Sequence, residues 1–241
     1  MKILLTISDV RQYRQLSKQI NSDSFDGHVR SVQQNQLCEL LNPALCYDFF
    51  NFLDNGFLEY SGTWTRDSVN QITIVGADVS TWIGYSLKIN DNVFVIVSNA
   101  VYGGVDTILT VTGYDLPAMI TTISYSAENK YVKLLNGDTY IYDSNTIQYN
   151  GLRPFLVWHL LSSYLVDGSL KQADLGNINI MGEHFTGASQ GLIREAKSEY
   201  LQNSTREQNH ISKYLNSNIT TYNLWESTSQ KNITTFDFMI I

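Results

Sequence analysis

The sequence predicts an α+β protein in which an α-helical bundle carries an inserted small β-barrel or β-sandwich module and ends in an extended C-terminal arm. Two observations predict this class. Residues 7–53 and 151–217 carry apolar side chains at helical spacing. In residues 60–148 the apolar side chains recur at every second position, which is the spacing of β-strands. We therefore assign three parts: a helical domain over 1–59 and 150–218, an inserted β-domain over 60–149, and an arm over 219–241.

The bulk composition restricts the possible partners. With 241 residues, 43% of them hydrophobic, the chain can bury a sizeable core. A net charge of −7 with 16% charged residues argues against a dedicated nucleic-acid-binding surface, which normally contains a basic patch. No stretch approaches the roughly 20 apolar residues of a membrane span. We expect no membrane partner and no specific binding of DNA.

The N-terminal third predicts three helices. The first begins at Thr6 or Ser8, with Asp9 near its positive end. The second carries apolar residues at spacings of three and four through Leu41. The pattern resets at Asn42-Pro43, because Asn is a good N-cap and Pro is tolerated at the first helical position. A third helix then runs towards Gly56, its expected C-cap.

Short strands follow from residue 60 onwards. They are expected at 71–75, 83–89, 93–97, 107–111, 121–125, 131–135 and 139–142. Asn136-Gly137 is the strongest hairpin signal, since a type I′ turn needs positive φ at both central residues. A second turn is expected at Asn90 to Asn92. Strands at this spacing are typical of a small barrel or sandwich.

The helical pattern returns at Gly151. Residues 155–161 are apolar on every side, which is typical of a helix at the centre of a bundle. A long loop punctuated by glycines, 169–188, follows; such loops are usually functional or become ordered by contact with a partner. Ser189 then opens the longest helix, and the chain ends in the apolar segment 234–241.

The sequence offers no catalytic constellation. The histidines stand far apart and share no metal-ligand spacing: His28, His159, His184 and His210. Glu183 and His184 are adjacent on an extended loop and should point apart, which disfavours an acid/base pair. We therefore expect no enzyme activity, no cofactor and no metal. The helical pattern around Cys38 and Cys46, with Pro43 between them, favours free thiols over a disulfide.

Aromatic residues in the β-region suggest an alternative, a glycan-binding module. They are Trp64, Trp82, Tyr85, Tyr102 and Tyr114. Alternating aromatics in strands are more typical of a barrel core or an interface. The two interpretations differ in whether Trp64 and Trp82 are exposed together.

The long loop and the apolar terminus indicate assembly. An extended apolar segment can add a strand to a neighbouring subunit, here with Phe236, Phe238 and Ile240 on one face. Met239 and Ile241 complete the apolar end. We interpret these residues as a partner-docking arm.

The helical frame resembles the head-to-tail connector, or adaptor, proteins of tailed bacteriophages, and the composition is similar to that of crAss-like phages of Bacteroidota. Three parts carry the resemblance: the N-terminal helix pair, 8–41; the apolar helix, 152–166, with its long loop; and the late helix, 193–214, with the face 194–200 and a trailing arm. These parts cover the two helical thirds of the chain.

The resemblance implies a dodecameric ring that lies beneath the portal protein in the virion neck, contacts further tail or ring proteins, and lets double-stranded DNA pass without specific binding. By position, the arm reaches the portal and 169–188 faces the channel. The residues implied for this channel loop are Lys171, Asp174, Asn177, Asn179 and Glu183. A tail-side stopper or terminator ring is the alternative among structural proteins.

Overall fold

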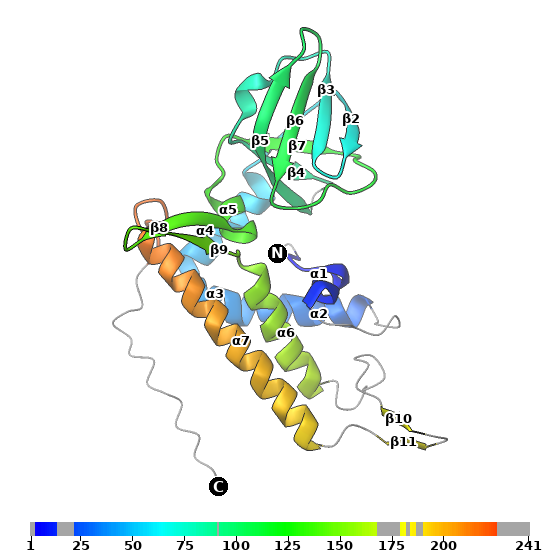
Figure 1. Ribbon diagram of the computed structural model, residues 1–241, viewed down its shortest axis with the longest axis vertical. Helices are drawn as coiled ribbons and strands as arrows, with labels where there is room; N and C mark the ends of the chain where they lie inside the picture. Colours follow the sequence, from blue (N-terminus) through cyan, green and yellow to red (C-terminus); the bar gives the residue numbers. More distant parts are fainter. Residues whose placement is uncertain are drawn as a thin grey trace.

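The computed structural model describes residues 3–13, 22–90, 92–167, 179–181, 184–186 and 190–225. It is a mixed α+β structure in which a curled, seven-stranded antiparallel sheet lies at one end and most of the helices lie at the other (Figure 1). The predicted α+β class is thereby confirmed.

The N-terminal helices follow the predicted breaks. They are α1 (Ile7–Tyr13), α2 (Ser22–Val32), a π-helical stretch η1 (Gln33–Leu37), α3 (Cys38–Leu41) and α4 (Pro43–Asn55). The side-chain oxygen of Asn42 accepts a hydrogen bond from the backbone N–H of Leu45 at 3.0 Å, and Pro43 occupies the first helical position. At the other end of α4, the N–H of Gly56 donates to the carbonyl of Phe52 at 2.7 Å. Both predicted caps are confirmed.

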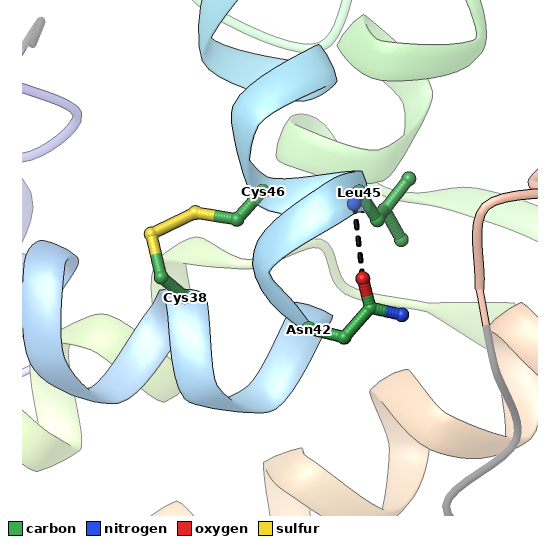
Figure 2. The surroundings of a disulfide bond; sticks show 4 residues. All are labelled: Cys38, Asn42, Leu45 and Cys46. Carbon is green, nitrogen blue, oxygen red and sulfur yellow. Dashed lines mark hydrogen bonds between the residues drawn. A yellow bond between two sulfur atoms is a disulfide. The ribbon is translucent and has the colours of Figure 1, made fainter.

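The two cysteines form a disulfide, so the expectation of free thiols was wrong. Cys38 on α3 and Cys46 on α4 are bonded across the elbow between the two helices (Figure 2). The chain turns sharply at Asn42, which has a φ of 61°, and this brings the two Cα atoms within 5.1 Å. That separation lies within the range that a disulfide can bridge.

The sheet has the strand order β1-β7-β4-β5-β6-β3-β2, and every pairing in it is antiparallel. Its strands are β1 (Leu58–Glu59), β2 (Thr63–Ser68), β3 (Gln71–Val75), β4 (Ser86–Ile89), β5 (Val93–Tyr102), β6 (Thr107–Thr112) and β7 (Ile123–Ser126), with a 3₁₀ turn, η2 (Ser80–Trp82), before β4. Inward residues such as Ile72, Leu87 and Leu109 are fully buried. The strand β2 was not predicted. The expected turn between Asn90 and Asn92 joins β4 to β5.

The strand expected at 131–135 is instead a helix, α5 (Lys130–Asn136). Gly137 is its C-cap, with a φ of 111°, and not the second residue of a hairpin turn. The hairpin lies one step further along: β8 (Asp138–Tyr142) pairs with β9 (Asn145–Tyr149). Its turn uses Asp143 and Ser144, with φ values of 47° and 64°. The local signal was misassigned because a glycine with positive φ serves a helix C-cap as well as a hairpin turn.

Two long helices complete the described chain. They are α6 (Arg153–Asp167) and α7 (Gln190–Ser217), which pack against each other (Figure 1). A short hairpin, β10 (Asn179–Met181) with β11 (His184–Thr186), lies between them in sequence. The predicted helix over 155–161 is confirmed, and Phe155, Leu156, Val157, Leu160 and Leu161 are buried, whereas Trp158 and His159 are partly buried. Its place at the centre of a bundle stays a prediction.

The buried residues form two separate cores. One lies within the seven-stranded sheet. The other joins the helices and includes residues of α5, β8 and β9, among them Leu134, Tyr140 and Tyr149. The elements between 60 and 149 therefore divide between the two cores. In the part of the chain that the structure describes, no helix is long and apolar enough to cross a membrane.

Candidate functional site

The predicted site residues lie almost entirely outside the described part of the chain. The arm residues Phe236, Phe238, Met239, Ile240 and Ile241 lie outside it, as do Lys171, Asp174, Asn177 and Glu183 of the predicted channel loop. Asn179 begins β10 and is the register partner of Thr186 on β11. The described residues therefore bring no predicted site together, and these roles stay predictions.

The β8–β9 hairpin is bound on one face and open on the other. The Tyr149 ring stacks on Tyr214 of α7 with centroids 4.0 Å apart, and the Tyr140 ring meets Tyr214 edge-on at 5.5 Å. The Tyr149 hydroxyl donates to the carbonyl of Leu134 at 2.9 Å. On the opposite face Ile141 is 73% exposed. A large apolar side chain is thus held in solvent on a firmly docked hairpin.

A second apolar projection is the tip of the β5–β6 hairpin, at the top of Figure 1. Its exposed apolar residues are Val101, Tyr102, Val105 and Ile108. The Tyr102 hydroxyl donates to the carbonyl of Gly104 at 2.7 Å, and the Asp106 carboxylate accepts from the N–H of Gly76 at 2.8 Å. These bonds fix the shape of the tip. Single exposed apolar residues are common on protein surfaces, whereas several gathered at one place are typical of interaction surfaces, and these four lie on one hairpin.

A buried polar junction connects the two cores. The Asp9 carboxylate accepts hydrogen bonds from the N–H of Thr6 at 2.6 Å, from the Thr6 hydroxyl at 2.8 Å, and from the Tyr114 hydroxyl. Asp9 belongs to α1, whereas Tyr114 lies in the segment that follows β6. Only 4% of Asp9 is exposed, and these hydrogen bonds offset the free-energy cost of burying its carboxylate.

Arg153, at the start of α6, extends this junction. Its guanidinium lies over the Tyr114 ring, 4.3 Å from the centroid, and donates to the side-chain oxygen of Asn136 at 2.6 Å. The amide of Asn136 in turn donates to the carbonyl of Phe94 on β5 at 2.6 Å. One continuous network thus connects α1, α5 and α6 to the sheet.

Burial sets the electrostatics of the junction. It raises the pKa of Tyr114 to about 12, and the hydrogen bond to Asp9 acts in the same direction. Burial lowers the pKa of Arg153, whereas the charge of Asp9 raises it. The arrangement holds an anion, a neutral phenol and a cation together. It positions the sheet on the helices.

A tyrosine cluster fixes the end of α7. The Tyr214 hydroxyl donates to Asp138 at 3.3 Å and lies 3.1 Å from the Tyr222 hydroxyl, which donates to the carbonyl of Lys130 at 2.7 Å. Burial raises the pKa of Tyr222 and of Tyr214 above the usual phenol range. These phenols therefore remain neutral and act as structural donors.

The segment after α7 is also anchored to the disulfide elbow. The Asn42 amide donates to the carbonyl of Leu224 at 2.9 Å, and the Trp225 indole N–H donates to Asn216 at 2.9 Å. Trp225 and Tyr222 are buried. The described chain therefore ends at a fixed point beside α3, α4 and α5.

A pocket of about 280 Å³ lies between α4 and α5. Its lining residues are Asp48, Asn51, Phe52, Asn55, Gly56, Glu128, Lys130 and Tyr131. The Tyr131 hydroxyl donates to Asp48, and the Lys130 ammonium pairs with Glu128 at 2.9 Å. These contacts give Asp48, Lys130 and Glu128 polar partners inside the pocket. The pocket is a polar recess in which the Tyr131 hydroxyl is hydrogen-bonded to the Asp48 carboxylate.

The aromatic residues of the sheet pack together. Trp82 is only 8% exposed and stacks on Tyr125, with ring centroids 4.5 Å apart. Tyr60 bridges Trp82 and Trp64, and the Trp64 indole N–H donates to the carbonyl of Ile120 at 3.3 Å. The two tryptophans are therefore not exposed together, which disfavours the glycan platform.

His159 and His210 have separate surroundings. The His159 Nδ1 lies 3.2 Å from the Ser204 hydroxyl, between α6 and α7, and burial lowers its pKa. The His210 Nδ1 lies 3.5 Å from Glu207 on the same helix. Within the described ranges, no group of three His, Cys, Asp or Glu side chains could hold a metal ion.

Sequence reasoning missed the two features that stand out most, the open β8–β9 hairpin and the Asp9 junction. A signal for the hairpin was present, because residues 138–149 alternate around Asp143-Ser144 and end at a tyrosine. The junction had no such signal. Asp9 and Tyr114 are 105 residues apart, and Asp9 alone is typical of any helix N-terminus.

Comparison with known proteins places half of the chain in a protein family. Residues 115–235, half of the chain, match the model of a family described as a family of unknown function, DUF6712. The matched region contains α5, the β8–β9 hairpin, α6 and α7. Neither a curated protein nor a solved structure matches the chain significantly.

Proposed function

The chain belongs to DUF6712, a family without a known function, and we propose that it is a structural virion protein that forms a ring beneath the portal, joins the phage head to the tail and lets DNA pass. The helices α1, α2, α6 and α7 overlap the residue ranges on which the resemblance to phage connectors rests. In this proposal they form the bundle of the connector type, and α6 with α7 forms the ring wall.

The observation that carries the proposal is the exposed apolar surface on rigid hairpins. Ile141 is 73% exposed and Val105 is 67% exposed, yet both stand on hairpins held by hydrogen bonds and stacked rings. Apolar groups held in this way lose little conformational entropy when a partner covers them. Such surfaces suit a subunit that is completed by its neighbours.

The polar junction supports the same role. A ring subunit must hold its parts in a fixed relation, because each neighbour contacts several of them. The network through Asp9, Tyr114, Arg153 and Asn136 connects the sheet to the helices through buried groups. We propose that this network keeps the sheet in one position on the outside of the ring.

The net charge suits a conduit for DNA. About twelve subunits with a charge of −7 each would carry a charge on the order of −80 together. A bore that neutralises few phosphates does not hold the strand, because each phosphate contact adds salt-dependent affinity. Lys171 is the only basic residue of the proposed channel loop, 169–188.

The test mixes the purified protein with its portal and measures co-elution by size-exclusion chromatography. We expect the full chain to join the portal. A chain that ends at Trp225 should keep its helical circular dichroism and lose the portal. A full-length variant with Phe236, Phe238 and Ile240 replaced by Ser provides the matched control for chain length, and it should fail in the same way.

The outcomes separate the parts of the proposal. Failure of the full chain to join the portal would contradict the ring beneath it. Binding of the truncated chain with unchanged affinity would contradict the role of the arm alone. Binding to a tail-side protein in place of the portal would indicate the stopper or terminator ring.

A further inference from the structure

The β8–β9 hairpin has an open edge whose geometry follows from its register. Tyr142 pairs with Asn145 next to the two-residue turn, which makes this pair hydrogen-bonded. Because antiparallel pairs alternate, Tyr140 with Ile147 is hydrogen-bonded too, whereas Ile141 with Thr146 is not. The backbone N–H and C=O groups of Thr139 and Ile141 therefore point away from β9.

Within the described residues no strand pairs with this edge of β8, because β8 and β9 form a two-stranded sheet. The outer face beside it carries exposed side chains from both strands: Thr139, Ile141, Thr146 and Gln148. Neither a proline nor a lysine nor a register shift occurs within β8. Proteins commonly use these features to protect an edge from further pairing. The edge of β8 lacks them.

The described chain ends close to this edge. Tyr214, in the last turn of α7, contacts Asp138 at the start of β8, and Trp225 is bonded to Asn216 at the end of the same helix. Figure 1 shows the turn that follows α7 beside β8. The eight residues from 226 to 233 then separate Trp225 from the apolar segment and span about 28 Å at most.

The apolar segment has the composition of an added strand. Residues 234–241 read Thr-Thr-Phe-Asp-Phe-Met-Ile-Ile, with β-branched and aromatic residues and a single charge. An added strand gains backbone hydrogen bonds along the edge and buries alternate side chains. Here Phe238 and Ile240 would lie on one face, and either could cover the exposed Ile141.

We propose that the free edge of β8 accepts residues 234–241 of a second copy of this chain as a third, added strand. The inference rests on the proposed ring. A segment of one subunit that binds a different surface of the next is a heterologous contact, and such contacts form a ring when the rotation between neighbouring subunits closes. Ring closure and portal docking then share the same segment. Closure uses its backbone and the face with Phe238 and Ile240, and the opposite face, with Met239 and Ile241, remains for the portal.

The first test uses the protein alone, without a portal, in sedimentation velocity. Ile141→Pro removes one outward N–H from the edge of β8 and leaves the β8–β9 hydrogen bonds in place. Thr146→Pro is the matched control, because it makes the same change on the outer edge of β9. We expect wild type and Thr146→Pro to self-associate, and Ile141→Pro to remain a monomer.

The second test measures binding of a labelled synthetic peptide of residues 226–241 to a chain that ends at Ile233, by fluorescence anisotropy. We expect saturable binding that Ile141→Pro weakens by about tenfold or more and Thr146→Pro leaves unchanged. If either proline unfolds the hairpin, Ile141→Lys with Gln148→Lys as its control tests the same edge, since an edge lysine opposes pairing.

Each outcome decides the inference. Equal peptide binding by Ile141→Pro and Thr146→Pro would overturn it. A second result would also overturn the second-copy assignment: the full-length chain is a monomer that does not bind the peptide, whereas the shortened chain binds it. This result would mean that residues 234–241 pair with the β8 edge of their own chain. Neither result depends on the portal, so a failed portal experiment alone would overturn only the proposed function.

Discussion

Replacing Asp9 by Asn should destabilise the protein strongly, because Asp9 is the anion of the junction between the two cores. The substitution keeps the shape of the side chain and removes its charge. Asp9 is buried, accepts three hydrogen bonds from Thr6 and Tyr114, and stabilises the charged form of Arg153. Leaving a partly buried cation without its anion, and weakening charge-assisted bonds, should lower the free energy of unfolding by about 2–3 kcal/mol.

Urea denaturation followed by circular dichroism measures this change. Asp115→Asn is the matched control, because Asp115 is exposed and follows Tyr114 directly; it should change the free energy of unfolding by less than about 0.5 kcal/mol. Tyr114→Phe removes the other side of the contact. In a double-mutant cycle, Asp9→Asn and Tyr114→Phe should show a coupling of about 1 kcal/mol. A value for Asp9→Asn within the range of the control would refute the reasoning.

Four further predictions concern the disulfide, the ionisation of Tyr114, the modularity of the sheet and the binding of DNA. The double substitution Cys38→Ser with Cys46→Ser removes the disulfide, which joins residues 8 positions apart in sequence. It should lower the free energy of unfolding by about 2.5 kcal/mol. Reductant should lower the melting temperature of the wild type but not of this variant. Folding raises the pKa of Tyr114 from 10.0 to about 12. The contribution of Tyr114 to stability is therefore complete below pH 10 and is lost as the pH rises from 10 to about 12. In urea denaturation, Tyr114→Phe should make the free energy of unfolding depend less on pH within this window. Residues 60–123 can be replaced by a short turn between Glu59 and Ser124, which are antiparallel register partners. This variant should keep its helical circular dichroism but unfold at lower urea, because Phe94 and Tyr114 are lost. Replacing 60–148 should abolish the helical signal, because Leu134, Leu135 and Tyr140 also leave the helical core. Finally, the protein should show no measurable binding of duplex DNA at physiological salt in a gel-shift assay; micromolar or tighter affinity would point to a nucleic-acid-binding function.

The predictable parts of the fold are those whose signals are local. Asn42-Pro43 marks a helix start because the Asn side chain and the ring of Pro both act within one turn. The strands at 71–75 and 107–111 could be found because their alternation matches one buried face. At Asn136-Gly137 the local signal was ambiguous. Tyr131, Val132, Leu134 and Leu135 fit a short helix as well as a strand.

The remaining features depend on contacts between distant residues. The disulfide needs the reversal at Asn42 to bring α3 and α4 together, and the spacing of Cys38 and Cys46 does not specify it. Asp9 accepts a hydrogen bond from Tyr114, and Asn42 donates one to Leu224, which lies 182 residues further along the chain. No pattern along the chain encodes such pairs. The open edge of β8 is also a tertiary feature, because α7 covers one face of the hairpin and leaves its edge free.

Electron cryo-microscopy of the protein mixed with its portal tests the central claim most directly. The account predicts a closed ring of identical subunits stacked on the portal, with the helices α6 and α7 in the ring wall and the seven-stranded sheets on the outside. A portal without added density, or single copies bound without contact to one another, would contradict it.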